Sequence, residues 1–94
     1  MASVRWRVEG VVQGVGFRWF VREAARRLDL AGWVLNRADG SVELAARGEP
    51  GALARLEAQV RQGPPGARVT DVVALDAPAD ADLPSPFHIH RRPP

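Results

Sequence analysis

The chain contains no cysteine, no lysine and no tyrosine among its 94 residues. Without cysteine there can be no disulfide, no thiolate nucleophile and no zinc site built on cysteine ligands. A reducing compartment is the natural setting for such a chain, so we expect a cytoplasmic protein. Without lysine the chain cannot complete a Walker A loop, which places that side chain beside the phosphates.

The sequence also lacks a long apolar run and the apolar centre of a signal peptide. No stretch approaches the roughly 18 consecutive apolar residues of a membrane span. The first ten residues alternate charged and apolar side chains instead. We therefore expect no association with a membrane.

Charge of one sign is not in large excess, because 13 arginines face 11 acidic residues and the net charge is +2. That balance argues against a dedicated nucleic-acid binder. With 46% hydrophobic residues, a chain of this length suits one small domain. We expect residues 1–94 to form that domain and to act as a monomer.

Two periodicities alternate along the chain. Val4, Trp6 and Val8 alternate with charged residues, as in a strand with one buried face. From Phe17 onward the apolar residues recur every three or four positions, as on one face of a helix, and Gly32 is the expected stop. The predicted strands are 4–10, 32–36, 41–47, 68–75 and 87–91, and the predicted helices are 17–31 and 50–62. The inward face of 68–75 stays open, because Val72 and Val73 are adjacent.

The order β-α-β-β-α-β with an extra C-terminal strand is that of an α+β, ferredoxin-like split β-α-β sandwich. Both helices should cover one face of a mixed sheet. In this topology strands 4–10 and 32–36 are parallel and strand 41–47 lies between them, so their carboxyl ends share one edge. Strand 41–47 carries no aromatic residue, whereas RNA-binding domains of this order stack bases on aromatic side chains. We expect no nucleic-acid partner.

Residues 8–18 run from a strand into a glycine-spaced turn and end on an arginine at the start of a helix. Gly14 and Gly16 free the backbone so that successive N–H groups can face one concavity. The helix N-terminus adds free N–H groups and a positive dipole end, and Arg18 adds planar paired donors. The sequence therefore predicts a phosphate-binding loop without a metal. Its members are Gln13, Gly14, Val15, Gly16, Phe17 and Arg18.

Asn36 ends the strand that returns to this edge, so its side chain and that of Arg18 should converge. Two strand spacings are about 10 Å, which a long arginine and a small substrate can bridge. Taken singly, each residue has a plainer interpretation. Gly14 and Gly16 are typical of turns, Arg18 of a solvated helix face, and Asn36 of a turn or cap.

Other polar and aromatic residues are interpreted as structural. His88 and His90 lie two apart on the last strand without a third ligand in view, which favours solvated edge residues over a metal site. Asp80 and Asp82 are interpreted as solubilising loop residues. Trp19 lies off the apolar helix face and is a candidate for the wall of the site, whereas other aromatic residues are assigned to packing: Trp6, Phe17, Phe20 and Trp33. We expect neither a metal nor a cofactor.

Two separated groups of residues match one family. The first comprises Gly10, Val12, Gln13, Gly14, Val15, Phe17 and Arg18. The second comprises Gly32, Trp33, Val34, Asn36, Gly40, Val42 and Gly48, and Gly63, Pro64, Pro65 and Val69 follow. With both groups at the right separation, the chain resembles an acylphosphatase over nearly its full length. Leu35 departs from the family, which more often has Lys, Arg or Gln there, so we expect an altered surface near the site.

The resemblance implies hydrolysis of the carboxyl–phosphate bond of small acyl phosphates, with Arg18 holding the phosphate and Asn36 orienting the attacking water. A noncatalytic module that binds phosphate or other anions in a regulatory role is the alternative. Similar domains also begin larger hydrogenase-maturation proteins that use carbamoyl phosphate. We do not expect that role, because the chain ends after the last strand and lacks the cysteines of their zinc-finger segments.

Overall fold

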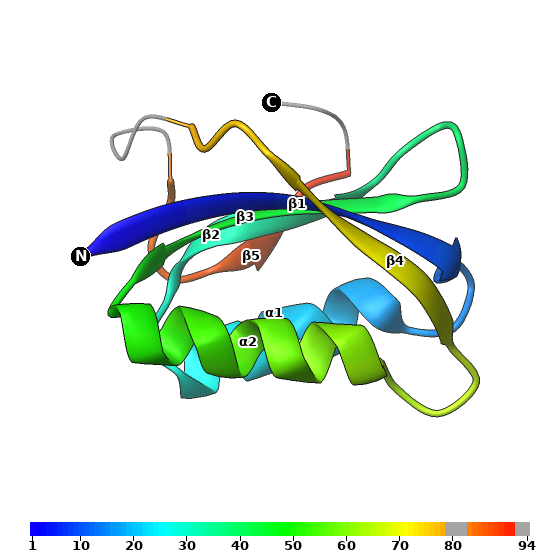
Figure 1. Cartoon of the computed structure of the whole chain (residues 1–94), viewed down its shortest axis with the longest axis horizontal. Coiled ribbons are helices and arrows are strands. Elements are labelled where there is room, and N and C mark those ends of the chain that lie inside the picture. The colour runs from blue at the N-terminus through cyan, green and yellow to red at the C-terminus, as the bar shows by residue number, and fades with distance from the viewer. Residues whose placement is uncertain (79–82, 92–94) are drawn as a thin grey trace.

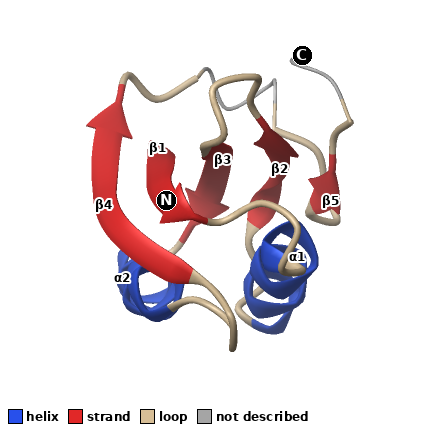
Figure 2. Cartoon of the chain, turned by 90° about the vertical axis from the view of Figure 1, so that its right-hand side faces the viewer, coloured by secondary structure: helices blue, strands red, loops and turns tan. Residues whose placement is uncertain are grey.

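Within residues 1–78 and 83–91, which the computed structural model describes, five strands form one mixed sheet and two helices cover one of its faces (Figures 1 and 2). The strands are β1 (Ala2–Val11), β2 (Ala31–Asn36), β3 (Val42–Gly48), β4 (Arg68–Leu75) and β5 (His88–Ile89), and the helices are α1 (Phe17–Arg27) and α2 (Pro50–Gln62). Asp80 and Asp82 lie outside the described residues. The predicted ferredoxin-like order, with both helices on one face and an extra C-terminal strand, is confirmed.

The strands follow the spatial order β4-β1-β3-β2-β5. β3 pairs antiparallel with both β1 and β2, so β1 and β2 run parallel to each other on either side of it. The predicted arrangement of these three strands is confirmed, and their connections place the carboxyl ends of β1 and β2 at the same edge. β5 adds a short parallel pairing to the outer side of β2.

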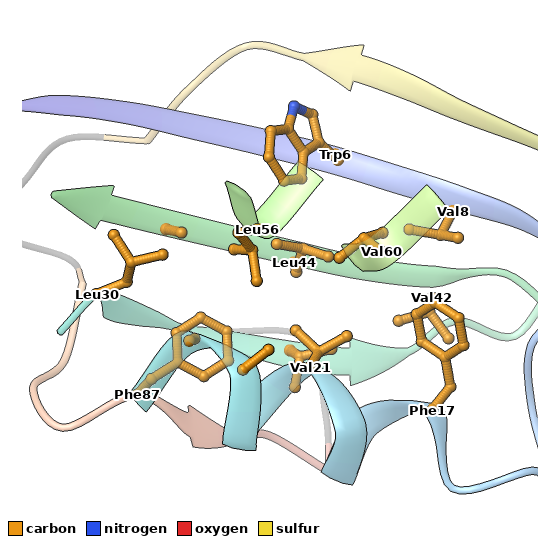
Figure 3. Packing of buried hydrophobic residues seen from close by; sticks show 14 of the residues in the cluster. Trp6, Val8, Phe17, Val21, Leu30, Val42, Leu44, Leu56, Val60 and Phe87 are labelled. Atoms are coloured by element: carbon orange, nitrogen blue, oxygen red, sulfur yellow. The ribbon is translucent and has the colours of Figure 1, made fainter. Parts of the chain in front are cut away.

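The core lies between the sheet and the helices. Trp6 and Val8 of β1 face it, and α1 contributes Phe17 and Val21 from one side of the helix, as the helical spacing predicts (Figure 3). Eleven side chains of this protein are less than 2% exposed in the described part of the chain, and Phe17 and Phe87 are among the largest of them. Val72 of β4 is buried and Val73 only half-buried, which settles the inward face of that strand.

Gly32 is not the stop of the first helix, as the sequence suggested. α1 ends at Arg27, and Asp29 takes a left-handed conformation (φ 57°) just beyond it. Gly32 lies inside β2 at φ 143°, where an added Cβ would stand 1.9 Å from the carbonyl oxygen of Ala45. The glycine therefore serves the close approach of β3 rather than the end of a helix.

The last strand is shorter than the predicted 87–91. β5 pairs with β2 only through Trp33 with His88 and Val34 with Ile89. The N–H of His90 still donates to the carbonyl oxygen of Val34 at 2.8 Å, and the chain bends at Arg91. Alternation of residue types predicted the strand, but the length of the pairing depends on where the chain leaves its neighbour.

Leu35 does not alter an exposed surface, contrary to the expectation from the family pattern. It is 1% exposed and belongs to a second apolar cluster with Trp33, Ala45 and Leu83. This cluster lies on the face of the sheet away from the helices, since Val34 between Trp33 and Leu35 faces the main core. An apolar residue at position 35 is therefore buried under the segment that contains Leu83.

Among residues 1–78 and 83–91 no helix is long and apolar enough to cross a membrane.

Candidate functional site

A cleft of about 180 Å³ opens where β1 and β2 end. Its lining residues are Val12, Gly14, Gly16, Phe17, Arg18, Trp19, Asn36 and Ile89. Arg18 and Asn36 therefore line the same cleft, and the predicted convergence of their side chains is confirmed. The chemical roles assigned to them stay predictions.

The loop between β1 and α1 depends on two glycines in the left-handed region. Gly14 has φ 77° and Gly16 has φ 75°. A Cβ at either position would meet nothing within 4 Å, so the requirement for glycine comes from the backbone conformation rather than from space. Left-handed residues beside right-handed ones are the usual way to turn successive N–H groups toward an anion.

Helix α1 begins at the cleft without a capping side chain. Gly16 is its N-cap residue, and the first turn contains no acidic residue. The N–H of Phe20 is the first to bond back into the helix, to the carbonyl oxygen of Gly16 at 3.0 Å. The helical N–H groups of Phe17, Arg18 and Trp19 thus have no intrahelical partner, and the positive end of the helix dipole lies beside the cleft.

Phe17 anchors this helix end in the core. Its ring is 2% exposed and lies 6.1 Å from the ring of Phe20, and Figure 3 shows it turned toward the other core side chains. Because Phe17 is fixed, the next residue, Arg18, leaves the core at the rim of the cleft. Arg18 is half-buried, and no hydrogen bond or ion pair joins it to another described residue.

Gln13 and Val15, which the sequence placed in the phosphate-binding loop, have structural contacts and do not line the cleft. The Nε2 of Gln13 donates to the carbonyl oxygens of Arg37 at 2.8 Å and Ser41 at 2.9 Å. Val15 packs against the main core. Gln13 thereby fastens the loop to the β2–β3 turn, directly beyond Asn36.

Asn36 carries an unsatisfied polar atom. It is the last residue of β2, and its Oδ1 is buried without a hydrogen-bond partner among the described residues. An acceptor left in this state costs about 1–3 kcal/mol relative to a satisfied one. Such an atom in a cleft indicates a place for a ligand or water that donates a hydrogen bond.

Arg18 is the charged residue in the lining of this cleft as far as the described chain shows. Arg37 follows Asn36 directly, but its guanidinium pairs with Glu43 and lies 3.8 Å from a carboxylate oxygen of Asp39. Hydrogen bonds from the hydroxyl and N–H of Ser41 lower the pKa of Asp39, so this carboxylate stays charged beside Arg37. The positive charge available to an anion in the cleft is therefore that of Arg18.

The two histidines are packed together rather than simply solvated. Their ring centroids are 4.6 Å apart, and the ring of His90 lies 5.8 Å from that of Trp33. Both residues are half-buried. In the described ranges, no group of three or more His, Cys, Asp and Glu side chains could hold a metal ion.

We expect His90 to make stability, but not activity, depend on pH. Burial lowers the pKa of His90 below the ordinary value of 6.5, and His88 lowers it further. As the pH falls below 6.5 the unfolded chain takes up a proton that the folded chain resists, so the free energy of unfolding decreases. Urea unfolding at pH 5 to 8 should show this decrease, and His90→Gln should reduce it. A near-neutral limb of the rate profile that disappeared in a double His→Ala variant would contradict the second half of the prediction.

Sequence reasoning missed part of the cleft wall. Trp19, which is 59% exposed, does line it as suggested, but Val12 and Ile89 were not assigned to the site. Ile89 reaches the cleft because β5 pairs with β2 in the register that sets it beside Val34. No local pattern carries that information.

Comparison with known proteins agrees with this geometry. The family model for acylphosphatase matches residues 4–89. An acylphosphatase from Nitratidesulfovibrio vulgaris (strain DP4) is 51% identical over 90 residues, which are 95% of this chain and 90% of the relative.

The chain belongs to the acylphosphatase family. The crystal structure of acylphosphatase from Bacillus subtilis superimposes with a TM-score of 0.88 at 41% identity, over 96% of this chain and 99% of that one. The structure of HypF from T. kodakarensis is also similar, with a TM-score of 0.81 and 29% identity, but this chain spans only 12% of it. Membership of the acylphosphatase family makes the chain an enzyme that hydrolyses acyl phosphates, and it favours this function over a noncatalytic anion-binding module.

Proposed function

We propose that this acylphosphatase cleaves the carboxyl–phosphate bond of small acyl phosphates in the cleft between the 12–16 loop and β2. Arg18 and the peptide N–H groups of the loop hold the phosphate, and Asn36 orients the attacking water. The observation that carries the proposal is the presence of Arg18 and Asn36 in one cleft at the positive end of α1. We further propose a single domain over residues 1–94 that acts as a monomer in the cytoplasm, for which the absence of cysteine is the support.

Phosphate binding follows from the donors around the cleft. The guanidinium of Arg18 has no competing partner among the described residues, so its paired N–H groups are free for two phosphate oxygens. The conformations of Gly14 and Gly16 and the uncapped helix end supply N–H groups for the remaining oxygens. These donors stabilise the charge that spreads over the equatorial oxygens in a loose transition state.

The water is positioned by the atom that lacks a partner. The buried Oδ1 of Asn36 accepts a hydrogen bond from the water and directs its oxygen toward phosphorus. The new bond forms between the water oxygen and phosphorus while the bond from phosphorus to the carboxyl oxygen breaks. A proton of the water passes to a phosphate oxygen, so an acyl phosphate dianion and water give a carboxylate and dihydrogen phosphate.

The leaving group needs no acid catalyst. A carboxylate has a conjugate-acid pKa of about 4, so it departs as an anion at neutral pH. This agrees with a cleft whose lining includes no imidazole, thiol or carboxylate among the described residues. The chemistry requires positioning and charge stabilisation, which are what Arg18, Asn36 and the loop provide.

Hydrolysis of benzoyl phosphate in the presence of a chelator tests the proposal. We expect turnover well above the uncatalysed rate, unchanged by the chelator. Calorimetry with inorganic phosphate provides the second measurement. Phosphate binding without turnover would instead identify a noncatalytic module, and turnover that disappears with the chelator would contradict the proposed mechanism.

We expect Gln13→Ala to weaken both stability and activity. Loss of its two hydrogen bonds should lower the free energy of unfolding by about 1 kcal/mol, since the carbonyl oxygens of Arg37 and Ser41 are accessible enough to bind water instead. The loop that carries the phosphate donors would no longer be tied to the strand end that carries Asn36. Misplacement of this kind should lower kcat/KM for benzoyl phosphate by roughly tenfold. Unchanged kinetics together with reduced stability would show that the tie does not position the site.

A further inference from the structure

A second groove continues from the cleft along the outer side of α1. It has a volume of about 340 Å³ and is lined by Arg18, Arg22, His88, Ile89 and Arg91. Arg18 and Ile89 also line the first cleft, so the two spaces meet at the residue proposed to hold the phosphate. One wall of the groove comes from α1, and the other comes from β5 and the residue that follows it.

The groove is strongly cationic. Three guanidinium groups line it, and within the described residues no acidic side chain does. Arg91 has no ion-pair partner in the described part of the chain. The Nε of Arg22 donates to Glu23 at 3.1 Å, but this bond uses one of the five N–H donors of the guanidinium. A groove of this kind favours an anion.

Its position relative to the phosphate site is set by the backbone. Arg22 follows Arg18 by one helical turn, a rise of about 6 Å along the axis. One turn further on, the Nε of Arg26 donates to the carbonyl oxygen of Phe87 at 2.7 Å and holds α1 against the chain just before β5. Arg91 therefore faces Arg22 across a gap of fixed width, with the apolar side chain of Ile89 between the phosphate site and the two outer arginines.

We propose that this groove binds the acyl part of the substrate and selects acyl phosphates whose acyl group carries a second anion. Arg22 and Arg91 are the specificity-determining residues, and the second anion is a carboxylate or a phosphate. Ile89 contacts the carbon chain or ring that joins the two charged ends. The inference rests on the proposed function, because it takes the phosphate of the substrate to lie at Arg18.

A matched pair of substrates tests the proposal. The probes are 3-carboxybenzoyl phosphate and 3-methylbenzoyl phosphate, which have similar size and differ in the second charge. We expect kcat/KM to be higher for the carboxy compound. The ratio of the two values should fall about fivefold in Arg22→Gln and in Arg91→Gln, and about 20-fold in the double variant, as for partly exposed charge pairs.

Arg27→Gln is the matched control, because Arg27 lies on the same helix, is exposed and does not line the groove. It removes the same charge, so it measures the long-range effect of net charge alone. The ratio for the wild-type enzyme should also fall between 0.02 M and 0.5 M salt, since screening shortens the range of these interactions, and it should change little in the double variant. A ratio that Arg27→Gln lowers as much as Arg22→Gln does would overturn the proposal.

A third probe, 3-phosphonobenzoyl phosphate, separates the two kinds of second anion. A higher ratio for the phosphono compound would identify a phosphate-bearing acyl group, and a higher ratio for the carboxy compound would identify a dicarboxylic one. Ratios at or below one for both compounds would overturn the proposal. If 3-methylbenzoyl phosphate is itself not hydrolysed, the proposed function fails; if all probes are hydrolysed with equal efficiency, only the groove assignment fails.

Discussion

Arg18→Ala should lower kcat/KM for benzoyl phosphate by about 10³-fold or more, by analogy with other arginines that stabilise phosphoryl transfer. Arg18 is the charged residue that lines the cleft in the described chain, so no neighbouring cation is in place to substitute for it. Steady-state hydrolysis measures the loss, and calorimetry with inorganic phosphate should show weaker binding. The fold should persist, because Arg18 makes no hydrogen bond or ion pair with another described residue.

Two further variants make this experiment specific. Arg27→Ala removes an exposed arginine from the last turn of the same helix and should leave kcat/KM within about twofold, because exposed charges at that distance are largely screened. Arg18→Lys keeps the charge but loses the planar pair of donors, and should recover only part of the activity. An Arg18→Ala enzyme that kept more than a tenth of the wild-type kcat/KM would remove Arg18 from the proposed phosphate site.

Asn36→Ala should lower kcat by about 10²- to 10³-fold and change KM little. The size of the effect is that of removing one positioned polar group from a transition state. KM should be nearly unaffected, because the phosphate is held by Arg18 and the loop rather than by Asn36. Steady-state kinetics with benzoyl phosphate separates the two parameters.

The same variant should not destabilise the fold. The Oδ1 of Asn36 is buried without a partner among the described residues, so its removal relieves an unsatisfied acceptor. We expect the free energy of unfolding in urea to stay equal or to rise by about 1 kcal/mol. Gln62→Ala, which removes an exposed amide at the end of α2, is the control for loss of an amide. A large loss of stability in Asn36→Ala, with kcat reduced only in proportion, would identify Asn36 as a structural residue.

Asn36→Asp makes a complementary test. The carboxylate keeps an acceptor for the water but adds a negative charge beside the bound phosphate. We expect KM to rise as well as kcat to fall, because like charges repel in the partly buried cleft. This pattern differs from that of Asn36→Ala and separates water positioning from phosphate binding.

The fold was largely predictable from local patterns. Alternation in 4–10 and the three- and four-residue spacing after Phe17 reflect the geometry of a strand and a helix, which each segment expresses independently. The ferredoxin-like order then follows from the sequence of elements. The errors occurred where tertiary contacts decide. Gly32 is needed by the approach of Ala45 from β3, and β5 ends where its pairing with β2 stops.

The site was predictable only in part. The glycine-spaced loop and Arg18 are close in sequence, so their proximity needs no knowledge of the fold, and Asn36 joins them through the parallel arrangement of β1 and β2. The hydrogen bonds of Gln13 to the β2–β3 turn were not predictable, nor was Ile89 in the cleft wall. The burial of Leu35 in a second cluster also depends on what covers the outer face of the sheet.

By itself, the sequence determined the kinds and order of the elements, the two left-handed glycines of the loop, and the family to which the chain belongs. These follow from backbone geometry and residue type, which act over a few neighbouring positions. The tertiary structure decided which side chains share the cleft and where the arginines of the second groove face each other. Those contacts depend on sheet order and register, which join segments that are distant in the chain and leave no periodic trace within either one.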